Sequence, residues 1–69
     1  MIKVMQIVDT DSNPNSYRIV AFADTKDEVD NGDTFVGLPR NATIEIGSMV
    51  MTADKDVAFM QSDGTWNWG

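Results

Sequence analysis

The sequence has 69 residues, a net charge of −6, and neither cysteine nor histidine. This length fits one small domain, residues 1–69. Without cysteine and histidine the chain has no disulfides, no thiolate or imidazole metal ligands, and neither the commonest catalytic nucleophile nor the commonest catalytic base. The five basic residues are scattered, which disfavours nucleic acid and anionic membranes as partners. We therefore expect no enzyme activity and no cofactor. A chain this short that has neither disulfides nor a structural metal site is commonly stabilised by oligomerisation.

The first 23 residues predict a hairpin of two strands. Residues 2–8 are mostly β-branched or apolar, which predicts a strand buried on both faces. Residues 9–16 contain Pro14 among Asn, Asp and Ser, a composition typical of a loop. Residues 17–23 predict the second strand.

The central segment predicts one helical turn and short extended pieces. Asp24 or Thr25 is suited to cap a turn that runs to Asp30, and Asn31-Gly32 is suited to end it. Residues 34–38 and 43–46 predict short strands, with Ile44 and Ile46 directed inward.

Residues 47–69 predict two consecutive hairpins that share their middle strand, and the rest of the chain is expected to organise around them. Asp63-Gly64 favours a two-residue turn, which pairs Phe59 with Trp68, and a looser turn at residues 53–56 pairs Val50 with Phe59. Side chains alternate across a sheet. One face is then expected to carry Val50, Val57, Phe59, Trp66 and Trp68, and the other Met49, Met51, Ala58 and Met60.

Both expected faces are apolar, which leaves the role of the methionine face open. It is either the second layer of a sandwich, packed by the N-terminal hairpin, or a subunit interface. The tryptophans either cover the core beside Phe59 or form a platform for a sugar or a base. The contact residues that we predict for an interface are Met49, Met51, Met60 and Trp68.

Five or six short strands predict a mainly β domain, either a small antiparallel sandwich or a partly open barrel. Two acidic stretches have partial EF-hand spacing. The first places Asp9, Asp11 and Asn13 correctly but has Pro14 where glycine is required and Val20 where glutamate belongs. The second has Leu38 at its last position, so we interpret both as solvated loops and expect no metal.

Four short motifs resemble a group of very small proteins encoded in the structural gene clusters of tailed bacteriophages and prophages. They are ADTKDEV (23–29), GLP (37–39), the GS-x-x-x-T-A step (47–53) and S-x-G-x-W-x-W (62–68). The resemblance implies a head- or tail-associated structural or accessory protein, and no catalytic residues carry over from it. It also implies partners among other virion proteins.

We therefore expect a structural or accessory protein that acts by self-association, as a trimer, ring or other homo-oligomer, and by docking to virion proteins. The expected location is the virion or the bacterial host cytoplasm, since residues 1–8 do not resemble a signal peptide and no apolar run reaches bilayer length. The alternatives are a carbohydrate-binding module that uses Trp66 and Trp68, and an acidic host-interaction protein.

Overall fold

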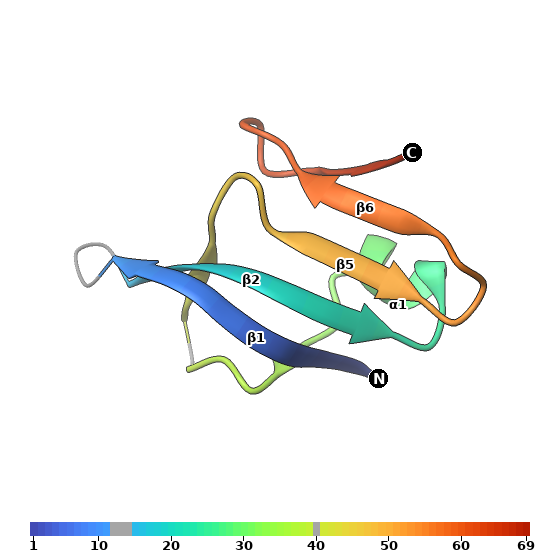
Figure 1. The fold of residues 1–69 in the computed structure, drawn as a ribbon, viewed down its shortest axis with the longest axis horizontal. Helices are drawn as coiled ribbons and strands as arrows, with labels where there is room; N and C mark the ends of the chain where they lie inside the picture. The colour runs from blue at the N-terminus through green and yellow to red at the C-terminus, as the bar shows by residue number, and fades with distance from the viewer. Residues whose placement is uncertain (12–14, 40) are drawn as a thin grey trace.

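The computed structural model describes residues 1–11, 15–39 and 41–69, and it confirms a small, mainly β domain. Seven strands form one sheet that does not close into a barrel, and one short helix, α1, lies behind it (Figure 1). No helix in the described part of the chain is long and apolar enough to cross a membrane. The elements are β1 (Ile2–Asp11), β2 (Ser16–Ala23), α1 (Lys26–Asp30), β3 (Phe35–Val36), β4 (Thr43–Ile44), β5 (Met49–Thr52), β6 (Val57–Met60) and β7 (Trp66–Trp68).

The strand order is β3-β1-β2-β5-β6-β7, with β4 also paired to β2. The expected N-terminal hairpin is present, because β1 and β2 pair antiparallel. The sheet as a whole is mixed, since β5 pairs with β2 in parallel, as β3 does with β1 and β4 with β2. Parallel neighbours require a crossover connection, and here residues 24–48 supply it.

The helix α1 begins and ends as its sequence predicts. The Thr25 hydroxyl accepts a hydrogen bond from the Glu28 amide, and after the Asn31 cap Gly32 adopts a φ of +76°. The Met1 ammonium donates hydrogen bonds to the carboxylates of Glu28 and Asp24. This contact with the ammonium lowers the pKa of Glu28. These hydrogen bonds therefore hold the start of β1 against α1.

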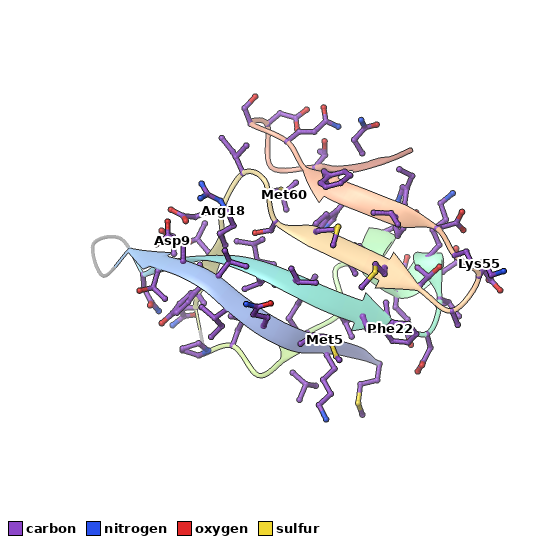
Figure 2. The ribbon with its side chains drawn as sticks, in the orientation of Figure 1. Met5, Asp9, Arg18, Phe22, Lys55 and Met60 are labelled. Atoms are coloured by element: carbon purple, nitrogen blue, oxygen red, sulfur yellow. The ribbon has the colours of Figure 1, made fainter. Side chains whose placement is uncertain are left out.

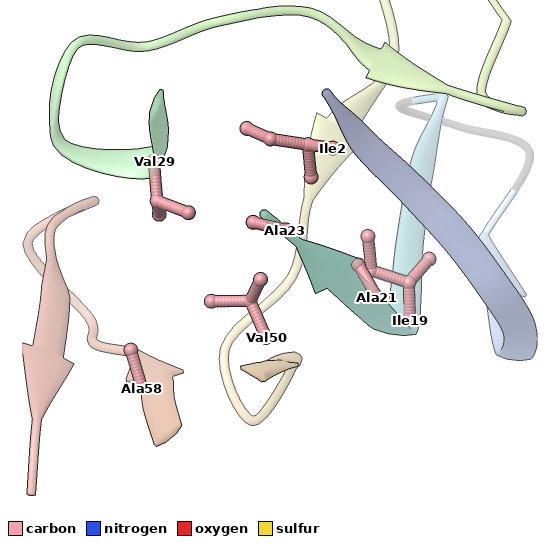
Figure 3. Packing of buried hydrophobic residues seen from close by; sticks show 7 residues of the cluster. All are labelled: Ile2, Ile19, Ala21, Ala23, Val29, Val50 and Ala58. Atoms are coloured by element: carbon pink, nitrogen blue, oxygen red, sulfur yellow. The ribbon is translucent and has the colours of Figure 1, made fainter. Parts of the chain in front are cut away.

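The crossover covers only one face of the sheet, and the core lies under it. Figure 3 shows the buried cluster from β1, β2, α1, β5 and β6, which consists of Ile2, Ile19, Ala21, Ala23, Val29, Val50 and Ala58. The opposite face is not covered by the described residues, so the expectation that β1 is buried on both faces is wrong: Met5 and Val8 are exposed. Ile46, expected to point inward, is also exposed, because β4 ends at Ile44.

The junction between β4 and β5 depends on a buried serine. β4 and β5 both pair with β2, but residues 45–48 leave a gap between the two ladders. Ser48 is fully buried in this gap, where its hydroxyl accepts a hydrogen bond from the Ile19 amide at 3.0 Å and donates one to the Tyr17 carbonyl. The Ser48 side chain thus supplies the Ile19 amide with a partner where the ladder is interrupted, while the Tyr17 carbonyl also accepts a hydrogen bond from the Glu45 amide.

The two C-terminal hairpins are present, but each pairs one residue away from the predicted register. Both loops contain three residues, 53–55 and 62–64, and the third residue of each has positive φ: +70° at Lys55 and +84° at Gly64. The first loop is thus one residue shorter than predicted and the second one residue longer, which pairs Met49 with Phe59 and Ala58 with Trp68. A one-residue shift moves side chains to the opposite face, so the predicted division of residues between the faces was wrong in part.

We predict that Ser48→Ala destabilises the fold by about 1–3 kcal/mol, because it leaves the buried Ile19 amide without a partner. The measurement is urea unfolding followed by circular dichroism. Ser62→Ala is the matched control, since Ser62 is exposed in a turn. Equal stability of the two variants would contradict the role assigned to Ser48.

We predict that Gly64→Ala lowers the free energy of unfolding by about 1 kcal/mol, since a Cβ there has open space and only the positive φ opposes it. Lys55→Gly is expected to raise stability by a few tenths of a kcal/mol, because the relief of positive φ exceeds the added chain entropy. Thermal unfolding measures both. Gly69→Ala is the control, with open space and no positive φ. A rise in stability for Gly64→Ala together with a fall for Lys55→Gly would contradict the turn assignment.

Candidate functional site

The most prominent surface is the side of the sheet turned away from α1, here called the outer face. Its centre consists of six apolar side chains on β2, β5 and β6: Val20, Phe22, Met49, Met51, Val57 and Phe59. The register aligns them in two rows across the strands, because Val20 pairs with Met49 and Met49 with Phe59, while Phe22 pairs with Met51 and Met51 with Val57. Figure 2 looks onto this face, with Phe22 labelled.

The outer face extends onto β1 through two bulges. The pairing of β1 with β2 shifts at Met5 and again at Val8. Each shift inserts one extra residue, so Met5 lies on the same side as Gln6, and Val8 on the same side as Asp9. Met5 is 64% and Val8 55% exposed, and both are apolar. The apolar surface therefore spans four adjacent strands.

Large and small side chains are distributed contrary to the usual pattern. The covered face of the sheet is built from small residues, among them Ala21, Ala23 and Ala58, and the largest fully buried side chain is isoleucine. The outer face instead carries Phe22 and Phe59, which are 36% and 50% exposed. Apolar patches of this kind on small proteins typically mark association surfaces.

Two of the four predicted interface residues lie on this face and two do not. Met49 and Met51 point outward from β5, each half-buried between its cross-strand neighbours. Met60 is 9% exposed on the covered face, and Trp68 also lies there. Grouping Met60 with the other methionines was therefore wrong, because the prediction used a four-residue loop at residues 53–56 where the chain has a three-residue loop.

The N-terminal hairpin does not cover the methionines of β5. The alternative that it forms the second layer of a sandwich is wrong, because β2 joins β5 edge to edge within the same sheet. The sequence reasoning also missed Val20 and Phe22 as part of this surface. Their signal was the alternation in residues 17–23, where Ala21 and Ala23 share one side and the larger Phe22 takes the other.

Charge is distributed unequally between the two sides of the sheet. On the outer face Lys3 pairs opposite Phe22, and the Arg18 guanidinium lies 3.5 Å from the Asp9 carboxylate. Arg18 also donates a hydrogen bond to the Ile46 carbonyl. Residues 24–33, which contain five carboxylates, run from the end of β2 through α1 on the other side (Figure 1). The outer face is therefore not acidic, although the protein is.

The two tryptophans lie against the covered side of the sheet. Trp66 stacks on Phe35 with ring centroids 5.9 Å apart. Trp68 donates a hydrogen bond from Nε1 to Asp30 at 2.9 Å, and the Lys26 ammonium lies 5.2 Å from the centre of its ring. Both pack on the core, as one of the two interpretations expected, but not beside Phe59, which faces the other way.

The cavities of the described part of the chain offer little chemistry. One of about 480 Å³ is lined by Thr34, Phe35, Leu38, Pro39, Asn41, Ala42 and Ile44, side chains without an acid or a base. No group of three or more potential metal-ligating side chains occurs among the described residues. Asn13 and Pro14 of the first EF-hand-like stretch lie outside them. Thr65 lowers the pKa of Asp63 by hydrogen bonding, but Asp63 is exposed in a turn.

Comparison with protein-family models, with curated proteins and with solved structures finds no match to this chain.

We predict that Asp30→Ala, in a Trp66→Phe background, shifts the Trp68 emission to longer wavelength and increases its quenching by acrylamide. The substitution removes the hydrogen-bond acceptor that holds the indole against α1. Asp27→Ala is the control, because it removes the same charge from the same helix. Identical spectra for the two variants would contradict the docking of Trp68 on Asp30.

Proposed function

We propose that this chain is a non-enzymatic structural or accessory protein of a tailed-phage or prophage virion, head- or tail-associated. It acts by self-association and by docking to other virion proteins, in the virion and, before assembly, in the bacterial host cytoplasm. The observation that carries the proposal is the outer face, an apolar surface across four strands that the described residues leave uncovered.

The composition of the core supports an associating role. A core whose buried apolar residues include three alanines removes little apolar surface from water, and a domain of this size has little stability to spare. Burying Phe22 and Phe59 against a partner would add apolar burial that the single chain lacks. Association and stability would therefore support each other.

The distribution of titratable groups supports a role without catalysis. The sequence supplies neither histidine nor cysteine. Within residues 1–11, 15–39 and 41–69, the carboxyl groups for which a perturbed pKa is found are Glu28, bound to the N-terminal ammonium, and Asp63, in a turn. Both are explained by local hydrogen bonds at the surface, whereas catalytic groups are characteristically perturbed in clefts.

The resemblance to small virion-cluster proteins supplies the biological setting. It rests on short motifs, two of which are explained by structure in this chain: ADTKDEV contains the cap of α1, and S-x-G-x-W-x-W contains the last turn and β7. Net negative charge and scattered basic residues favour protein partners over nucleic acid or membrane.

The test is to quantify this chain by mass spectrometry in particles purified from a host that carries its gene. We expect the wild type in the particles and a reduction of at least tenfold for Phe59→Asp, because a charge at an interface core is strongly unfavourable. Ser62→Asp adds the same charge in an exposed turn and is the control. Absence of the wild type from particles would overturn the virion role.

Phe59→Thr separates loss of docking from loss of folding. Threonine is β-branched, which suits a strand as the aromatic side chain does, and it removes the aromatic surface. We expect Phe59→Thr to retain the wild-type circular dichroism spectrum and to be depleted from particles. A folded Phe59→Thr variant that is incorporated normally would overturn the docking role of the outer face.

A further inference from the structure

We infer that the outer face binds a second copy of this chain, sheet against sheet, across a two-fold axis that passes near Met49 and Met51. This inference rests on the proposed role of the outer face as an association surface and specifies its partner. Three observations carry it: the position of the charges, the distribution of exposed apolar side chains, and the size of the face.

The position of the charges permits two copies of an acidic protein to meet here. Five carboxylates lie in residues 24–33, on or beside the helix behind the sheet (Figure 1). In a face-to-face pair both helices lie on the outside, separated by two sheets and about 30 Å at about 10 Å per layer. That separation is several times the Debye length of about 8 Å at physiological ionic strength. Repulsion between the acidic segments is therefore screened.

The outer face itself contributes almost no repulsion. Its central rows are uncharged, and Arg18 and Asp9 form an ion pair on β1 and β2. Lys3 lies at the β1 side of the face, where charges belong to the rim of an interface and remain hydrated. The outer face carries too little net charge to require a strongly acidic partner surface. The same apolar face of a second copy therefore fits it.

The distribution of the other exposed apolar side chains favours two-fold symmetry. Met1, Ile7, Val36 and Ile46 are exposed but lie on the chain end, the opposite side of β1, the short strand β3 and a loop. A head-to-tail assembly needs two different complementary patches, whereas a two-fold assembly needs one self-complementary patch. The outer face is the one extended apolar patch among the described residues.

The size of the face predicts a reversible dimer. Four strands of about five residues present a flat area of roughly 300 Å², at about 4.8 Å between strands and about 3.3 Å per residue. With the relief of the side chains, two copies bury on the order of 1,000 Å², near the lower end of specific interfaces. We therefore expect a dissociation constant in the micromolar range rather than a permanent dimer.

The test uses the absence of cysteine in the sequence, which makes any introduced thiol unique. Met51→Cys places a thiol beside the proposed axis, where it meets its own copy. Under mild oxidation we expect Met51→Cys to form a disulfide-linked dimer at least tenfold faster than Thr34→Cys, which places an exposed thiol between α1 and β3. Adding Phe59→Thr to Met51→Cys is expected to slow dimer formation to the control rate.

The mass of the unmodified chain is the second measurement. Sedimentation equilibrium is expected to show a concentration-dependent rise from 7.6 kDa to twice that mass. A monomer at millimolar concentration, a trimer or larger ring, or equal cross-linking rates at Met51→Cys and Thr34→Cys would each overturn the inference. A monomeric chain that still enters particles in a Phe59-dependent way would overturn only the dimer. A dimer absent from particles would overturn only the virion role.

Discussion

The left-handed third residue of each C-terminal turn is the constraint on which the surface of this protein depends. Lys55 and Gly64 each complete a three-residue loop, so that β5, β6 and β7 pair even positions with even and odd with odd. Val50, Ala58 and Trp68 therefore share the covered side. The odd positions carry Met49, Met51, Val57 and Phe59 to the other side. With two-residue turns, Phe59 would have entered the core and Met60 would have left it.

The crossover between β2 and β5 explains why one face stays open. Its described residues, 24–39 and 41–48, contain a single five-residue helix and two strands of two residues, which is enough for one layer. Small side chains on the covered face, such as Ala21 and Ala23, let this layer approach closely, and Val29 enters the core from α1. In the part of the chain that the structure describes, no comparable layer covers the large side chains on the opposite face. The fold thus combines a modest core with an apolar surface suited to a partner.

Local features were predictable from the sequence because short-range chemistry sets them. The Thr25 cap, the end of α1 at Asn31-Gly32 and the hairpin of β1 and β2 follow from residues close together in the chain. The predicted register of the last two hairpins was wrong for two reasons. Asp-Gly suits loops of two or three residues, and no local signal marks Lys55 as left-handed. The parallel pairing of Val20 with Met49 joins residues far apart in sequence. The alternation of side chains within either strand therefore does not predict it. Of the four candidate contact residues, Met60 was misplaced because of the wrong register, whereas Trp68 shares the side of Val50 in the prediction and in the structure.

The edges of the sheet are protected in a way that its outer face is not. β3 covers the start of β1 at Ile2 and Lys3, and the two bulges of β1 interrupt the remainder of that edge. At the opposite end β7 has only three residues. Short and bulged edges are the usual means by which sheets avoid strand-to-strand aggregation. A chain that limits pairing at its edges while keeping phenylalanine and methionine on its face restricts association to one direction, perpendicular to the sheet. That restriction separates a specific association surface from a general tendency to aggregate.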